Sequence, residues 1–267
     1  MSIERHGPGN NIVSHYARQN EKYREVLNRL MLICPLEFIS NVLEHTEMND
    51  PAHSPEHVLG VCYNALRYEH VTDTDAFLKY SDEILIACLG HDCMSHINRS
   101  EHHTLGAQYV GDLLRYYKRH SSHFQNLNIE LVEEAIAKHR SSFRGVRDSD
   151  VADIVASADR GEPNLYHYIE SACLYRLGPA LEDSESLSDI AYEDVVDESI
   201  KHLIEKFGSE GTIWKTLPKH YSHLYAEEIH GLKYMLEKPE SLDVLKVYAL
   251  RKKEELVNKT LKHLHRY

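Results

Sequence analysis

Apolar residues recur at helical spacing through most of the chain, and this spacing limits the available folds more than any other feature. Residues 17–33 carry one such stripe, made of Tyr23, Val26, Leu27, Leu30 and Met31. No segment of convincing length alternates apolar and polar residues, which is the pattern typical of a half-buried strand. The sequence therefore predicts an all-α fold.

Short segments with glycine, proline or a helix-capping residue separate the predicted helices. The helices are expected at residues 17–33, 36–46, from Pro55, 75–90, after Ser100, 128–140, 149–159, 191–207, 218–237 and 240–264. Ser54 followed by Pro55 marks one helix start, because serine is a common N-cap and proline fits the first helical position. Ser100 is expected to cap another helix.

The length of 267 residues suits one large domain or a domain with an extension. Between Glu182 and Glu198 the chain has many acidic residues and no basic one, which indicates a solvated linker and the start of a helix. We expect an N-terminal helical arm (1–39), a catalytic core (40–180) and a C-terminal helical extension (181–267).

The net charge of -12 argues against a general nucleic-acid binder or a membrane-surface protein, since both need a basic face. No apolar run is long enough to span a membrane, and the first residues do not look like a signal peptide. Five cysteines without CxxC spacing suggest reduced thiols in the cytoplasm. The cysteines are Cys34, Cys62, Cys88, Cys93 and Cys173.

Histidine and aspartate residues stand at the ends or on one face of several predicted helices. Six of them, here called the six candidate ligands, are His57, His91, Asp92, His102, His139 and Asp159. Imidazole and carboxylate together suit iron, manganese or zinc. His53 is an alternative to His57, and His96 and His103 are alternatives to the later histidines.

The residues around the six candidate ligands also follow an ordered pattern. His57 has Val61 and Ala65 four and eight positions later on its predicted helix. The His91-Asp92 pair follows the apolar segment 84–90, and Asp159 follows an alanine within a helix. His102 stands four residues before a Gly-Ala step, and His139 follows an isoleucine by three.

This ordered set resembles the HD-domain metallohydrolases, over roughly residues 50–165. The resemblance implies an HD-domain helical bundle with N- and C-terminal helical extensions. It also implies a first ion held by His57, His91, Asp92 and Asp159, and a second completed by His102 and His139. Asp92, His102 and His139 would then also serve catalysis, with Asp92 placed to accept a proton from the attacking water.

A metal-dependent phosphohydrolase acting on a nucleotide or a related small phosphorylated metabolite is the function that this resemblance implies. The cofactor would be one or two divalent ions, manganese or iron ahead of zinc, nickel, cobalt and magnesium. The phosphate-facing lysine that commonly follows the His-Asp pair is absent, as are the Glu-Asp pair of guanosine-tetraphosphate hydrolases and the Gly-Tyr-Pro signature of cyclic-di-GMP phosphodiesterases. Phosphate contacts are therefore expected from arginine. The candidates are Arg144 first, then Arg140, Arg99 and Arg160.

Two other functions fit the same residues. Some HD-domain relatives use these ligands for a mixed-valent di-iron centre that activates oxygen. A degenerate HD domain could instead bind a nucleotide without turning it over, although retention of every ligand type argues against this. The sequence leaves the substrate, the native metal and any homo-oligomer open.

Overall fold

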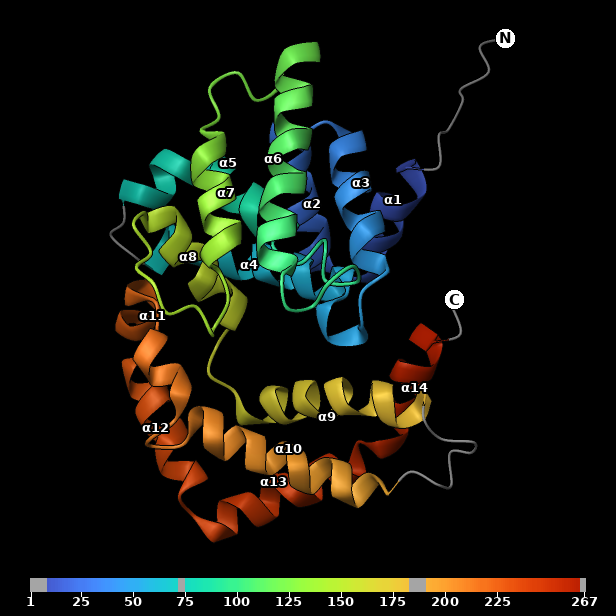
Figure 1. Cartoon of the computed structure of the whole chain (residues 1–267), viewed down its shortest axis with the longest axis vertical. Coiled ribbons are helices and arrows are strands. Elements are labelled where there is room, and N and C mark those ends of the chain that lie inside the picture. Colours follow the sequence, from blue (N-terminus) through green and yellow to red (C-terminus); the bar gives the residue numbers. More distant parts are fainter. Residues whose placement is uncertain (1–8, 72–74, 183–190, 265–267) are drawn as a thin grey trace. The chain divides into compact units, whose positions relative to one another are not determined.

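The computed structural model describes residues 9–71, 75–182 and 191–264 (Figure 1). Within these ranges the chain forms helices and no strand, so the predicted all-α class is confirmed there. The residues considered for a signal peptide, and residues 183–190 of the acidic segment, lie outside the described ranges.

The chain forms two compact units, each with its own apolar core. The first comprises residues up to Asn49, His53–Gly161 and Pro218–Leu224. Its helices are α1 (Gly9–Gln19), α2 (Glu21–Ile33), α3 (Leu36–Glu47), α4 (Pro55–Val71), α5 (Asp75–Gly90), α6 (His102–His120), α7 (Ile129–Lys138), α8 (Asp150–Arg160) and α11 (Lys219–Leu224). A short 3-10 turn, η1 (Pro51–His53), precedes α4.

Helix α5 lies at the centre of the first unit. It packs against α4, α7 and α8, while α6 packs along α7 and α11 packs on α8. The buried stretch from Ile84 to Leu89 explains this position, because a helix that is apolar all round is stable only when neighbours cover it. The C-terminal end of α5 is therefore surrounded by the neighbouring helices.

The second unit comprises Asp50–Ala52, Glu162–Leu217 and Tyr225–Tyr267. Its elements are α9 (Leu165–Glu182), α10 (Tyr192–Phe207), η3 (Thr212–Thr216), α12 (Ala226–Leu236), α13 (Pro239–Arg251) and α14 (Lys253–Leu264). Helix α9 packs against α10, α13 and α14. The rings of Tyr168 and Phe207 stack with centroids 4.4 Å apart between α9 and α10.

The two units differ from the division expected from composition. The chain passes from the first unit to the second between Gly161 and Glu162, and not near residue 180. Gly161 follows α8 with φ +61°, a conformation that glycine adopts without steric cost. Helices α1 to α3 belong to the first unit, because their apolar faces join its core.

Several predicted helix boundaries were wrong. The expected helix 17–33 begins eight residues earlier as α1 (Gly9–Gln19) and is interrupted at Asn20, whose side chain caps α2 by accepting from Lys22 N at 3.0 Å. The expected helix after Ser100 starts with Glu101 as its N-cap, because the Ser100 hydroxyl bonds Asn98 instead.

Two predicted C-terminal helices are each divided in two. The segment 218–237 breaks at Tyr225 and 240–264 breaks at Lys252, which separate α11 from α12 and α13 from α14. Helix α9 was not among the predicted helices. The helices expected from Pro55 and at 36–46, 75–90, 128–140, 149–159 and 191–207 are all present, within one or two residues wherever both ends were predicted.

Candidate metal centre

The six candidate ligands meet in the first unit although five different helices supply them. His57 lies in the first turn of α4, and His91 and Asp92 directly follow α5. His102 is the first residue of α6, His139 caps the end of α7, and Asp159 lies in the last turn of α8. Residues at helix ends can converge in this way because several helices end in the same region.

The Asp92 carboxylate stands between two groups of histidines. Its Oδ2 atom is 3.5 Å from His57 Nε2 and 3.3 Å from His91 Nε2. Its Oδ1 atom is 3.1 Å from His102 Nε2 and 3.6 Å from His139 Nε2. Each carboxylate oxygen of Asp92 therefore faces its own pair of imidazole nitrogens.

Asp159 completes the group on the Oδ2 side. Its Oδ1 atom lies 3.2 Å from His57 Nε2 and 3.4 Å from His91 Nε2, and those two nitrogens are 3.3 Å apart. Donor atoms that bind one ion at about 2.1 Å with tetrahedral or octahedral angles lie roughly 3.0–3.5 Å from one another. The spacing fits one ion held by these residues and Asp92.

The second group is smaller and more deeply buried. His102 Nε2 and His139 Nε2 are 3.3 Å apart, and both face Asp92 Oδ1. His102 and His139 are almost fully buried, whereas the side chains of His57 and Asp159 remain 24% and 21% exposed. The centre is therefore open to solvent on the side of His57 and Asp159.

Main-chain carbonyls orient three of the four histidines. The Nδ1 atom of each donates to the carbonyl three residues earlier: His91 to Cys88 at 2.7 Å, His102 to Arg99 at 2.8 Å and His139 to Ile136 at 2.7 Å. A bond of this kind fixes the proton on Nδ1 and leaves the Nε2 lone pair available for a metal. The three rings are thus oriented with Nε2 toward Asp92.

Both aspartates stay ionised in this environment. Burial raises the pKa of Asp92, but the neighbouring His91, His102 and His139 outweigh it and hold the pKa well below the usual value. The same balance applies to Asp159, where hydrogen bonds from His57 and His91 outweigh burial. Burial lowers the pKa of His91, but Asp92 and Asp159 in turn outweigh burial and raise that pKa well above its usual value. The carboxylates and imidazoles together form a donor set that can hold a divalent ion.

The alternative histidines lie outside this donor set. Within the described chain, groups with metal-ligand spacing form from His57, His91, Asp92, His102, His139 and Asp159 alone. The His53 ring lies beside that of His57, with centroids 5.8 Å apart, but its Nε2 accepts from Arg99 Nη2 at 2.6 Å. His96 hydrogen-bonds Asn49, and His103 lies 3.4 Å from Arg140 Nη1.

The four candidate arginines have different positions. Arg99 donates to His53, which lies near His57. Arg140 Nη1 donates to Ser100 O at 2.6 Å and lies 3.4 Å from Nδ1 of His103, the residue after His102. Arg144 is exposed on the loop after α7, and no described contact joins it to the six candidate ligands. Arg160 is buried and donates to Ala156 O at 2.5 Å.

Two residues that were not predicted from the sequence bond the main chain at or beside the candidate ligands. Arg147 donates through Nε to Lys138 O at 3.0 Å and through Nη2 to Arg140 O at 3.1 Å, so it binds the main chain on both sides of His139. Asn49 bonds the main chain of Asp92. Arg147 stands between two ligands in sequence, which is a weak signal, and nothing in the sequence singles out Asn49.

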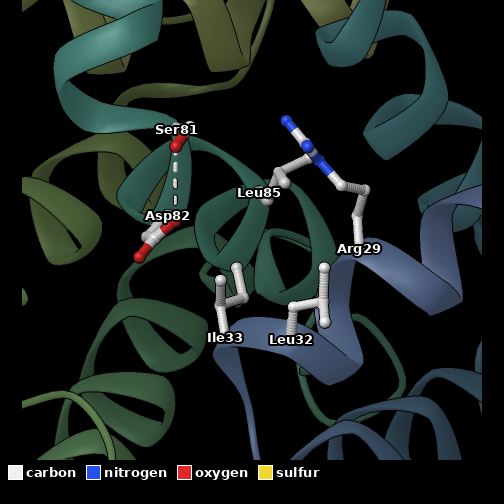
Figure 2. Close-up of a pocket in the computed structure, with 6 residues that line it drawn as sticks. All are labelled: Arg29, Leu32, Ile33, Ser81, Asp82 and Leu85. Atoms are coloured by element: carbon white, nitrogen blue, oxygen red, sulfur yellow. Dashed lines mark hydrogen bonds between the residues drawn. The ribbon is translucent and has the colours of Figure 1, made fainter.

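A small pocket of about 170 Å³ lies between α2 and α5, away from the six candidate ligands (Figure 2). Arg29, Leu32 and Ile33 line it on one side, and Ser81, Asp82 and Leu85 on the other. Leu32 is 79% exposed, so this hollow is shallow. It offers no enclosed binding site.

No family model matches the chain, and neither a curated protein nor a solved structure is similar enough to count as a match. In the described residues, no helix is both long and apolar enough to cross a membrane.

Proposed function

We propose that the chain is a metal-dependent phosphohydrolase of the HD-domain type, acting on a nucleotide or a related small phosphorylated metabolite. The observation that carries this proposal is the position of Asp92, whose two carboxylate oxygens face separate pairs of imidazole nitrogens. A carboxylate so placed is suited to bridge two ions. The order of ligands along the chain and the helical bundle around them also fit this family.

In this proposal His57, His91, Asp92 and Asp159 would hold one ion, while His102, His139 and Asp92 would hold the other. Such ions would supply Lewis-acid chemistry toward a phosphoryl oxygen and water. The chain itself fixes the donor atoms in advance through the Nδ1 bonds to main-chain carbonyls, so little reorganisation opposes binding.

Asp92 suits a bridging ligand better than a proton acceptor. Its pKa is held well below the usual value by the surrounding histidines, and a carboxylate with a low pKa is a weak base. The pKa of Asp159 is held low in the same way, so in this proposal both aspartates act as ligands and neither is assigned the proton.

We propose that the guanidinium groups of Arg99 and Arg140 bind the phosphate of the substrate. Arg99 contacts His53, whose ring lies beside that of His57. Arg140 contacts His103, whose ring lies beside that of His102. Guanidinium groups bind phosphate oxygens in a bidentate manner and offset their charge. This local positive charge would attract a phosphorylated substrate to an otherwise acidic chain.

The test is metal analysis followed by a phosphate-release screen. Protein purified without chelator would be analysed for bound metals, reloaded with Mn²⁺ or Fe²⁺, and assayed on a panel of nucleotides and sugar phosphates. The proposal expects metal-dependent phosphate release that is lost in His91→Ala. Oxygen consumption with a mixed-valent electron paramagnetic resonance signal, and no phosphate release, would favour the di-iron oxygenase instead.

A further inference from the structure

Asn49 is a buried side chain that joins three segments around the candidate metal centre. It follows α3 and is only 1% exposed. Its Nδ2 atom donates to His53 O and to Asp92 O, both at 2.9 Å. Its Oδ1 atom accepts from His96 N at 2.8 Å. The amide thus ties the turn before α4, the ligand after α5 and the segment leading to α6 to one point.

The identity of the partners fixes the orientation of this amide. The two carbonyl oxygens can only accept and the His96 N–H can only donate, so Nδ2 must face the carbonyls and Oδ1 the N–H. Only asparagine among side chains of this size offers two donors and an acceptor in that arrangement. An aspartate would set a negative oxygen against two carbonyls, and an apolar side chain would leave three buried groups without this partner.

Two of these contacts bear directly on the ligands. The Asp92 carbonyl belongs to the residue that faces both histidine groups, and the His53 carbonyl lies one helical turn before His57. Supporting hydrogen bonds of this kind hold metal ligands in place, and their loss commonly costs about 10–100-fold in metal affinity. We propose that Asn49 is a positioning residue of the metal centre, which fixes the main chain at Asp92 and ahead of His57 so that their side chains meet on one ion.

Thr46 provides a matched comparison in the last turn of α3, three residues before Asn49. It is fully buried, and its hydroxyl donates to Val42 O at 2.7 Å within α3. Thr46→Val removes a buried hydrogen bond close to Asn49 without touching any segment that carries a ligand. If Asn49 had a purely structural role, substitutions at Asn49 and Thr46 would affect Mn²⁺ affinity equally and would differ only in how much they lower stability.

The experiment measures Mn²⁺ affinity of the full-length, metal-free chain, with free Mn²⁺ counted by electron paramagnetic resonance. Thermal unfolding of the metal-free variants is recorded in parallel. We expect Asn49→Asp and Asn49→Ser to bind Mn²⁺ about 10–100-fold more weakly than wild type, and Thr46→Val to stay within about two-fold. Equal Mn²⁺ affinities in Asn49→Asp and Thr46→Val would overturn the role of Asn49.

The visible absorption spectrum of the Co²⁺-loaded protein adds a signature of ligand geometry. We expect it to change in Asn49→Ser and to match wild type in Thr46→Val. Because the inference rests on the proposed metal centre, wild-type protein that binds no Mn²⁺ or Co²⁺ would overturn both. Wild-type binding with unaffected Asn49 variants would overturn this inference alone.

A measurement on the wild-type protein covers the case in which the Asn49 variants do not fold. Selective ¹⁵N labelling of asparagine reports the side-chain amide of Asn49 directly. We expect its N–H resonances to shift when Zn²⁺ is added to the metal-free chain, since Nδ2 donates to the carbonyl of Asp92. Unchanged resonances at saturating Zn²⁺ would contradict the proposal.

Discussion

His102 Nε2 lies 3.1 Å from Asp92 Oδ1, on the side of the carboxylate turned away from His57 and His91. Because His139 Nε2 lies on the same side, the donor atoms can be assigned to two groups that share Asp92, and His139 also lies within ligand spacing of His91 and Asp159. This division determines how the stoichiometry of metal binding should respond to substitution.

We expect two transition-metal ions per chain at saturation, and one in His102→Ala or His139→Ala. Each substitution removes one of the two imidazoles facing Asp92 Oδ1 while leaving the other group complete. Elemental analysis after loading with Mn²⁺ and desalting would measure the stoichiometry, with His120→Ala, at the far end of α6, as the control. One ion in wild type, unchanged by either substitution, would contradict the two-ion arrangement.

His91→Ala and Asp92→Ala should each reduce phosphate release to background while the protein stays helical. These side chains face the donor atoms of the site and not the apolar core, so their loss affects metal binding first. Activity would be measured together with far-ultraviolet circular dichroism. Near-normal turnover in either variant with metal bound would exclude the pair as ligands.

Arg99→Ala and Arg140→Ala should raise KM or lower kcat for a phosphorylated substrate without releasing metal. Loss of a charge-assisted phosphate contact in a dry site costs about 2–4 kcal/mol, and the exposed contacts of these arginines place them at the lower end. Arg144→Ala, first favoured from the sequence, tests the exposed loop in the same assay. If all of these variants match wild type, the phosphorylated substrate itself becomes doubtful and the oxygenase gains support.

Arg147→Ala should destabilise the protein by about 1–3 kcal/mol, because two hydrogen bonds from a charged donor are lost. It should also weaken metal binding, since Arg147 holds the main chain on both sides of His139. Denaturant unfolding and Mn²⁺ titration would be compared with Arg119→Ala, an exposed arginine near the end of α6. Equal metal affinity in the two variants would limit Arg147 to a structural role.

Asp153 of α8 binds the start of α11, and this contact should weaken at acidic pH. Its carboxylate accepts from Lys219 N and His220 N at 2.8 Å and from His220 Nδ1 at 2.5 Å. Burial raises its pKa, but the bonds from His220 and Lys219 outweigh burial and hold the pKa below its usual value. A lowered pKa stabilises the fold above the unfolded-state value, and this contribution is lost as the pH falls through the folded-state value.

Stability should therefore fall below about pH 4 in wild type, and less steeply in Asp153→Asn. Asp153→Asn should itself cost about 1–3 kcal/mol at pH 7, because it weakens bonds to a charged acceptor. Urea unfolding between pH 2 and pH 7 would measure both effects. Parallel pH profiles for the two proteins would show that Asp153 does not contribute through its charge.

The sequence by itself predicted the helical class, most helix positions and the residue types of the candidate metal centre. Helical spacing of apolar residues is a local property, and His91-Asp92 after a buried helix indicated one pair of candidate ligands without knowledge of the fold. The breaks at Asn20 and Lys252 were missed, because a helical stripe continues through a break when both halves face the same core. At Tyr225 the chain passes from α11 of the first unit to α12 of the second, and the change of core leaves no local signal.

Only the tertiary structure decided which residues meet. His57 and His53 are one turn apart and chemically alike, and the packing of α4 against α5 and α8 turns His57, not His53, toward Asp92 and Asp159. Asn49 contacts the main chain of Asp92, which is far from it in sequence, and Arg147 contacts that of Lys138 across a loop. Such contacts leave no pattern in sequence spacing. Local periodicity specifies helices, whereas the distances between donor atoms depend on how those helices pack.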